Sequence, residues 1–381
     1  MRVVFLTHNY PRDPADAAGA FLRPLATALA ARGHDLRVVA PSDQGRGGRE
    51  PLDGIPVRRV RYGSASRERY AYSGRMHEAL RSPAGVLAFA RMLGALRRGA
   101  RYEAAGALPG EVVVHAHWWV PGGLAAPPDL PAVVTLHGTD GALLDRSALS
   151  RMLARRVLQR CRAVTAVSRP LAERAARATA LAKPVRVLPM PVPSAGWPWR
   201  TGGGGLLILG RLTAQKRVDL ALRAAAIVQA QRPVRIRVVG DGPERPGLEK
   251  LAHDLGLGPA TEFTGSVPPA TVPALIAEAD AGVFTAVGEG LGLAAAEMLM
   301  VGVPVVACRD GGGVLDVVSA TGAGRVVDPE PRAIAGALLD VLDNRAALET
   351  ARSEGHALRE RLTPEATAAG FEALYQAAVR G

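Results

Sequence analysis

A glycine-rich segment, Gly288-Glu-Gly-Leu-Gly-Leu-Ala-Ala-Ala-Glu297, combines groups that can bind an anion with groups that can bind hydroxyls. It lies between an apolar strand and an apolar helix, so free backbone N–H groups and the helix dipole are expected to attract negative charge there. Gly290 and Gly292 allow the backbone to approach a ligand closely. Glu289 and Glu297 can accept hydrogen bonds from the hydroxyls of a sugar or ribose. The glycines alone fit an ordinary strand-to-helix turn equally well.

Two cations mark a second candidate loop, Leu209-Gly-Arg-Leu-Thr-Ala-Gln-Lys-Arg217. An arginine fork at Arg211 and a lysine point charge at Lys216, five positions apart, can hold a diphosphate between them. Lys216 is one of only three lysines in the chain. A third loop, Val239-Gly-Asp-Gly-Pro243, also follows an apolar strand and can approach a ligand through the backbone of Gly240.

These loops need parallel strands to position them, because ligands of open α/β sheets bind beyond the carboxyl ends of the strands. In the second half of the chain, the apolar pattern predicts strands at residues 206–209, 235–239, 262–264, 281–285, 303–307 and 322–327. Helices are predicted between them at residues 218–229, at 248–255 and from 293 onward. Residues 331–342, 345–361 and 364–379 show no strand pattern and are predicted to be helices.

The first half shows the same alternation. A strand at 2–7, a helix that ends at Arg32-Gly33 and a strand at 36–40 form a βαβ unit. Buried parallel strands are predicted at residues 112–115, 132–136, 163–167 and 185–188. A Pro/Gly-rich stretch at 189–205 separates the halves. We therefore expect an α/β protein of two Rossmann-like domains facing a central cleft, residues 1–190 and 191–363.

Composition limits the class of protein. The chain has 381 residues, 48% apolar and 22% charged, which suits two packed domains and excludes a mainly disordered protein. No apolar stretch approaches the roughly 18 residues that span a bilayer, and Val3–Leu6 is too short for a signal peptide, so a cytoplasmic protein is expected. Cys161 and Cys308 lack the spacing of a zinc site or a disulfide framework.

Positive charge is concentrated in the first half. The net charge is +12, and residues 1–190 hold 29 Lys and Arg against 14 Asp and Glu. Eleven arginines and only two glutamates lie between Arg58 and Arg101. This segment could bind an anionic acceptor or make a peripheral membrane contact, or it could be a solvated face of an arginine-rich protein. With 4% aromatic residues, the chain lacks the stacking side chains of a nucleic-acid binder.

Taken in order, the motifs resemble the retaining GT-B glycosyltransferases of family 4, the glycosyl transferases group 1. The second half carries GRLTAQKR, VVGDGPE, FTGSV, EGLGLAAAE and GVPVVA, and the first half RGHDLRVVAP, VVHAHWW, VTLHGTD and AVTAVS. The similarity covers nearly the whole chain. It implies a two-Rossmann enzyme that transfers a sugar from a nucleotide diphosphate sugar with retention of anomeric configuration. It also implies that the helix at 364–379 packs back onto the first domain.

The resemblance implies roles for single residues. Arg211 and Lys216 match the diphosphate-binding pair, Glu297 the carboxylate that binds the ribose, and Glu289 and His137 the contacts to the donor sugar. The expected donor site comprises Gly19, Gly210, Arg211, Lys216, Gly240, Val267, Glu289, Gly290, Leu291, Gly292, Leu293 and Glu297. Its catalytic residues would be Arg211, Lys216, Glu289 and His137. Gly19 is the nearest match to a glycine pair of the family's first loop, so that contact departs from the pattern.

No metal or other cofactor is expected. His115 and His117 lack a third ligand, and the two cations with the helix dipole can stabilise a leaving diphosphate. The chain has no GxxxxGK motif, no GxGxxG in its first loop and no Asp-x-Asp. Their absence argues against a P-loop nucleotidase, a dinucleotide-dependent oxidoreductase and a manganese-dependent glycosyltransferase of the other common fold.

The sequence leaves several questions open. UDP is the expected donor nucleotide on frequency alone, with GDP as the alternative. The acceptor could be a small metabolite, a natural-product intermediate or a lipid, because the loops of the first domain set it. A nucleotide-sugar 2-epimerase of the same fold and a non-catalytic nucleotide-sugar binder remain as alternative functions.

Overall fold

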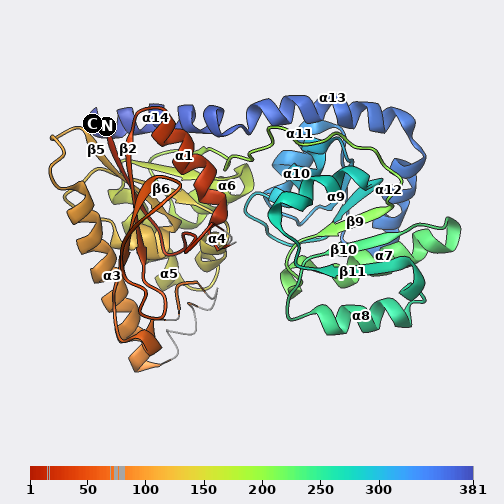
Figure 1. The fold of residues 1–381 in the computed structure, drawn as a ribbon, viewed down its shortest axis with the longest axis horizontal. Helices are drawn as coiled ribbons and strands as arrows, with labels where there is room; N and C mark the ends of the chain where they lie inside the picture. Colours follow the sequence, from red (N-terminus) through yellow and green to blue (C-terminus); the bar gives the residue numbers. More distant parts are fainter. Residues whose placement is uncertain (15, 17, 69, 73–75, 77–81, 381) are drawn as a thin grey trace. The chain divides into compact units, whose positions relative to one another are not determined.

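The computed structural model describes residues 1–14, 16, 18–68, 70–72, 76 and 82–380. By its contacts the chain divides into two compact units, shown in Figure 1: unit 1 is Met1–Pro191 with Pro364–Gly381, and unit 2 is Val192–Thr363. Each unit has one largely parallel sheet with helices packed on it. The expected fold class, α/β with two Rossmann-like domains, is confirmed. No helix of the described residues is both long enough and apolar enough to cross a membrane.

Within the described residues, the sheet of unit 1 has the order β3-β4-β2-β1-β5-β6-β7-β8. Its strands are β1 (Arg2–Leu6), β2 (Asp35–Pro41), β3 (Gly48–Leu52), β4 (Ile55–Val60), β5 (Val112–His117), β6 (Ala132–Leu136), β7 (Ala163–Ala166) and β8 (Val185–Val187). The central strands β5 and β6 are buried along their whole length and β1 from Val3 onward, which is why these sequences are mostly apolar.

The edge of this sheet differs from the predicted parallel arrangement. β3 and β4 form an antiparallel hairpin, whereas no strand was expected in either segment. Its turn is Asp53-Gly54, with φ of 52° and 76°. A two-residue turn with both φ values positive matches the twist of paired strands, and Asp-Gly is a favoured pair for it. The sequence Leu52-Asp-Gly-Ile55 is therefore the local pattern that indicates this hairpin.

The helices of unit 1 are α1 (Arg23–Ala31), α3 (Pro83–Ala104), α4 (Thr139–Leu144), α5 (Ala148–Arg160), α6 (Arg169–Thr179) and α14 (Pro364–Arg380). Helix α3 starts at a proline, and the Ser82 side chain accepts a hydrogen bond from the Gly85 N–H, so the helix begins with a capped end. α14 packs against α1 and against β5 and β6, and Figure 1 shows it beside α1.

The described part of unit 2 has a parallel sheet in the order β11-β10-β9-β12-β13-β14. Its strands are β9 (Leu206–Leu209), β10 (Ile236–Val239), β11 (Thr261–Gly265), β12 (Ala281–Phe284), β13 (Val305–Cys308) and β14 (Arg325–Val327). Its helices are α7 (Val218–Gln231), α8 (Arg245–Asp254), α9 (Val272–Glu278), α10 (Leu293–Val301), α11 (Val314–Thr321), α12 (Pro331–Asp343) and α13 (Arg345–Arg361). α7 packs on α12, and α10 packs against α9, α11 and α13.

The strand order changes direction at one place in each sheet. In unit 2, β10 pairs with one side of β9 and β12 with the other. In unit 1, β2 and β5 flank β1 in the same way. Loops that leave the carboxyl ends of such strands diverge to opposite faces, which opens a crevice where ligands of this kind of sheet bind. The predicted site residues lie in or just after the loops that follow these strands or the strands next to them.

Candidate functional site

In unit 2, the loops after β9, β10 and β11 contact one another through glycines. The Gly210 N–H donates to the Val239 carbonyl at 3.0 Å, and the Gly240 N–H donates to the Gly265 carbonyl at 2.9 Å. A Cβ on Gly240 would lie 2.0 Å from the Gly210 oxygen. Glycine at Gly240 is therefore needed for the approach of the two loops. Val267, one of the expected donor-site residues, follows β11 and is partly buried.

The structure brings Arg211 and Lys216 together. Both line one small pocket at the ends of β9 and β12. Arg211 is exposed and has no ion-pair partner among the described residues, whereas Lys216 Nζ lies 2.9 Å from Glu289 Oε1. Lys216 Nζ also lies 5.5 Å from the centre of the Phe284 ring. Three of the four predicted catalytic residues thus surround one point at the carboxyl edge of this sheet.

A second ion pair holds the backbone that carries Lys216. The Arg217 guanidinium makes a bidentate contact with Asp310 at 2.8 and 2.6 Å and donates from Nε to the Thr285 carbonyl. The Thr285 hydroxyl lies within hydrogen-bond distance of the Lys216 carbonyl, at 2.9 Å. Arg217 also adopts φ of 47°, a left-handed conformation that non-glycine residues seldom adopt without support. These contacts tie the loop after β9 to the ends of β12 and β13.

The segment Arg309-Asp-Gly-Gly-Gly313, after β13, supports the glycine-rich loop. The Glu289 N–H donates to the Gly311 carbonyl at 2.9 Å, and the Gly313 N–H donates to the Glu289 carbonyl at 2.8 Å. A Cβ on Gly312 would lie 2.7 Å from the Glu289 oxygen. Neither this segment nor Arg217 is among the predicted site residues. Two features of the sequence could have identified these residues: the cation next to Lys216, and the run of glycines after a buried strand.

Helix α10 begins without a side-chain cap. Its N-cap, Gly292, has φ of 79°, and no side chain accepts from the first turn. Within the described residues, no acceptor is found for the N–H groups of Gly290, Leu291, Gly292 and Leu293. Open N–H groups at the positive end of a helix form an anion-binding site. The predicted phosphate-binding backbone is therefore free to bind.

Glu297 lies one turn into α10, between the buried residues Ala296 and Met298. It has no ion-pair partner among the residues the structure describes. Burial raises the pKa of Glu297 to about 7, because the charged form is poorly solvated there. A carboxylate in an apolar helix, without a partner of its own, is available to accept hydrogen bonds from a ligand.

In unit 1, a buried carboxylate shapes the loop of His137. Asp140 Oδ1 accepts the N–H groups of His137 at 3.0 Å and of Gly138 and Gly141 at 3.1 Å. Its other oxygen accepts the Trp119 N–H at 3.2 Å. Burial raises the pKa of Asp140 to about 6, although hydrogen bonds from backbone N–H groups, including those of Trp119, His137 and Gly138, oppose that shift. Asp140 closes the motif His137-Gly-Thr-Asp140, yet it is not among the predicted site residues.

Aromatic side chains surround the His137 ring. The Trp118 ring lies 4.4 Å from it and the Phe21 ring 5.2 Å, measured between centroids. Trp118 has φ of 64°, and its indole N–H donates to the Thr139 hydroxyl at 3.1 Å. A left-handed tryptophan is strained, so its placement beside His137 is a marker of a functional site. Phe21 follows Gly19, whose Cβ would lie 2.2 Å from the Asn9 oxygen.

His137 and Gly19 therefore belong to unit 1, and the other predicted site residues belong to unit 2. His115 is buried and hydrogen-bonded to the Thr135 hydroxyl and the Tyr375 hydroxyl, each at 2.6 Å. Across the described part of the chain, no group of three or more His, Cys, Asp and Glu side chains could hold a metal ion.

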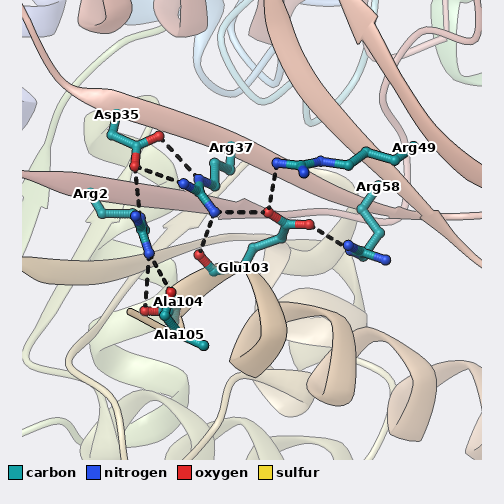
Figure 2. A network of polar contacts seen from close by, with 8 residues as sticks. All are labelled: Arg2, Asp35, Arg37, Arg49, Arg58, Glu103, Ala104 and Ala105. Carbon is teal, nitrogen blue, oxygen red and sulfur yellow. Dashed lines mark hydrogen bonds and ion pairs between the residues drawn. The ribbon is translucent and has the colours of Figure 1, made fainter. Parts of the chain in front are cut away.

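Much of the arginine-rich segment forms internal ion pairs. Figure 2 shows Glu103, which is 1% exposed, in contact with Arg37 at 3.3 Å, Arg49 at 3.5 Å and Arg58 at 2.5 Å. Arg61 pairs with Glu68 and Arg101 with Asp129. The predicted contact of residues 58–101 with an acceptor or a membrane also involves Arg69, Arg75 and Arg81, which lie outside the described residues. The described pairs support a structural role for this segment.

Comparisons with known proteins matched both halves of the chain. Residues 196–361 match Glycosyl transferases group 1, and residues 18–195 match Glycosyltransferase Family 4. Glycogen synthase of Mycobacterium tuberculosis is 29% identical over 411 aligned positions, which cover all of this chain and 96% of that protein. Sucrose-phosphate synthase of Thermosynechococcus elongatus has a similar fold, with a TM-score of 0.78, 20% identity and 98% of each chain covered. Anabaena HepE, solved with UDP, has a TM-score of 0.72 at 18% identity over 98% of this chain and 99% of its own.

Proposed function

Because the chain belongs to the glycosyl transferases group 1, of GT-B architecture, we propose that it transfers a sugar from UDP-sugar to an acceptor nucleophile with retention of anomeric configuration. The observation that carries the proposal is the carboxyl edge of the sheet in unit 2. There, open N–H groups of Gly290–Leu293 lie with two cations, Arg211 and Lys216, and two carboxylates, Glu289 and Glu297.

The cations and the start of α10 suit a diphosphate. Arg211 can bind two phosphate oxygens through its fork, and the uncapped N–H groups can bind others. Lys216 carries three N–H donors, so it can keep its contact with Glu289 and still donate to a phosphate. That contact also brings Glu289 beside the phosphate-binding residues, where the donor sugar would be attached.

Glu297 suits the ribose. Its carboxylate has no partner among the described side chains and lies one turn beyond the phosphate-binding N–H groups. Two ribose hydroxyls can donate to its two oxygens. UDP is the proposed nucleotide because Anabaena HepE, of the same fold, was solved with UDP. In unit 1, His137 is proposed to contact the transferred sugar.

In the proposed reaction, the bond between the anomeric carbon and the β-phosphate oxygen breaks, and a bond from the acceptor oxygen to the same face of that carbon forms. The acceptor's proton passes to the leaving phosphate. Negative charge develops on the diphosphate as the bond breaks, and preorganised Arg211, Lys216 and N–H groups stabilise it more in the transition state than in the ground state.

A thermal-shift panel of UDP, GDP, ADP and TDP, each with and without EDTA, tests the donor site. A ligand at a hundred times its Kd adds about 2.7 kcal/mol to stability, so the cognate nucleotide should stand out. Glu297→Ala should abolish the UDP shift, while Glu360→Ala, an exposed carboxylate on α13, should keep it. The absence of a shift with any nucleotide would overturn the proposal.

Product analysis tests the chemistry. Incubation of the protein with UDP-sugars and a panel of acceptors should release UDP and yield a glycoside whose anomeric configuration matches the donor. Conversion of the donor to a 2-epimer without an acceptor would instead identify an epimerase of the same fold. Binding of the donor with no release of UDP would identify a non-catalytic binder.

A further inference from the structure

His117 contacts the candidate sugar-binding histidine from within the core of unit 1. It ends β5, and its side chain is fully buried. Its Nδ1 lies 3.0 Å from the Nε2 of His137. Its own Nε2 is buried and has no hydrogen-bond partner within the described part of the chain. His117 is therefore tied to His137 by one hydrogen bond, and its second nitrogen makes none.

The proton of that bond can belong to either ring. Burial holds the pKa of both histidines well below the usual value, so each ring is neutral and carries one N–H. If His137 donates from Nε2, His117 must carry its proton on the buried, unpaired Nε2. If His117 donates from Nδ1, that buried nitrogen is only an unpaired acceptor. Among backbone groups, orphaned buried N–H groups are rarer than under-satisfied carbonyls, and the same preference applied to the ring disfavours an unpaired, buried Nε2–H.

The geometry points to His117 as a positioning residue that donates its Nδ1–H to His137 Nε2 and so fixes His137 as the Nδ1–H tautomer. His137 is partly buried, and its Nδ1 makes no hydrogen bond to the described residues. The open edge of the ring therefore presents an N–H donor. This inference rests on the proposed function for its consequence: the ring would donate a hydrogen bond to an oxygen of the transferred sugar.

The surroundings of His117 prevent it from turning away. Its ring lies against the His115 ring, with centroids 4.1 Å apart and the planes tilted by 37°, and Phe5 lies edge-on at 4.7 Å. His115 is held on both sides by Thr135 and Tyr375. His117 therefore has a single buried orientation, which is what a side chain that sets the tautomer of its neighbour requires.

Nuclear magnetic resonance of the full chain with ¹⁵N-labelled histidine tests the assignment, because two-bond couplings show which ring nitrogen carries the proton. The His137 signals are identified by their loss in His137→Asn. In the wild type, His137 should be the Nδ1–H tautomer. In His117→Leu, which has no donor, it should shift toward Nε2–H, and in His117→Asn, which places an N–H near the position of Nδ1, it should revert. An Nε2–H tautomer in the wild type, or no change in His117→Leu, would overturn the inference, and the wild-type spectrum decides it even where a variant fails to fold.

Activity separates this inference from the proposed function. His117→Leu should lower kcat/KM for the UDP-sugar by about tenfold, the scale of one lost hydrogen bond, with UDP affinity unchanged and partial recovery in His117→Asn. If the spectra show the expected tautomers but His137→Asn keeps full turnover, the positioning inference stands and the sugar contact of His137 is wrong. If the tautomers differ but UDP binds and is released, the proposed function stands without it.

Discussion

The two candidate binding regions differ in how their polar groups are satisfied. At the carboxyl edge of the sheet in unit 2, the N–H groups that begin α10 lack acceptors and Arg211 lacks a partner among the described residues. In unit 1, the backbone of the His137 loop is bonded internally: Asp140 accepts four backbone N–H groups, and His117 bonds one nitrogen of the ring. Open donors suit a charged ligand, whereas an internally bonded loop suits the precise orientation of one side chain.

The largest effect is expected in the open region. Lys216→Ala should lower the rate of UDP release by about 10²–10³-fold, because one preorganised cation on the leaving diphosphate is lost. Lys250→Ala is the matched control, since Lys250 is an exposed lysine of α8 in unit 2 that pairs only with Asp254 among the described residues. A Lys216→Ala enzyme with the turnover of the control would remove Lys216 from the proposed mechanism.

In the His137 region, we expect a substitution to change the stability of unit 1. Asp140→Ala leaves four backbone N–H groups without their acceptor, and we expect it to lower the free energy of unfolding of unit 1 by about 3 kcal/mol. Urea unfolding followed by tryptophan fluorescence, to which Trp118 and Trp119 of unit 1 contribute along with Trp197 and Trp199, measures the change. Asp129→Ala, which loses only an exposed pair with Arg101, should change it by less than about 1 kcal/mol. Equal stability of the two variants would contradict the role of Asp140.

A pH titration of UDP binding tests the role of Glu297 in the unit 2 region. Only the charged carboxylate accepts hydrogen bonds from both ribose hydroxyls, and the pKa of Glu297 is raised to about 7 in the free protein. UDP affinity should therefore rise with pH, by up to tenfold per unit below pH 7, and level off above it. Calorimetry between pH 5.5 and 8.5 measures this. Glu297→Gln should remove the pH dependence that comes from Glu297 and leave only that of the UDP phosphate. Identical pH profiles for the wild type and Glu297→Gln would rule out the ribose contact.

The smallest effect is expected at Tyr375, the partner of His115. Tyr375→Phe removes the hydroxyl that bonds His115 and should destabilise unit 1 by about 1 kcal/mol. Tyr102→Phe, which loses an exposed hydroxyl on α3, should be neutral in the same unfolding measurement. A neutral Tyr375→Phe would show that the buried hydrogen bond adds nothing to the packing of α14.

Local sequence patterns predicted most of the elements. The strands at Ala132–Leu136 and Leu206–Leu209 and the helix at Arg345–Arg361 have the predicted bounds, because each is a continuous apolar run or a helical repeat between clear breaks. The hairpin of β3 and β4 was missed because neither strand is a continuous apolar run: β3 is exposed except at Leu52, and β4 alternates buried and partly buried residues. The Asp-Gly turn is the clearest local sign of this hairpin.

The sequence predicted those candidate-site residues whose own side chain or backbone could contact a ligand. It did not predict those that act by holding another residue in place. The motifs around Lys216 and Gly292 identify groups that can meet a ligand. Asp140 and Asp310 bind other groups of the protein, backbone N–H groups and a guanidinium, so no ligand chemistry marks them. Their partners lie on other loops, and no spacing in the chain reveals those contacts.

The sequence by itself determined the fold class and the order of most elements, and it supplied the charged and glycine residues that are proposed to bind a nucleotide sugar, because these depend on local periodicity and on residue chemistry. Only the tertiary structure decided that Lys216 pairs with Glu289, that Arg217 holds its loop to Asp310 and that His117 bonds His137. Those contacts join residues from different strands and loops. Which groups meet there, and which remain open to a ligand, depends on how each sheet brings the carboxyl ends of its own strands together.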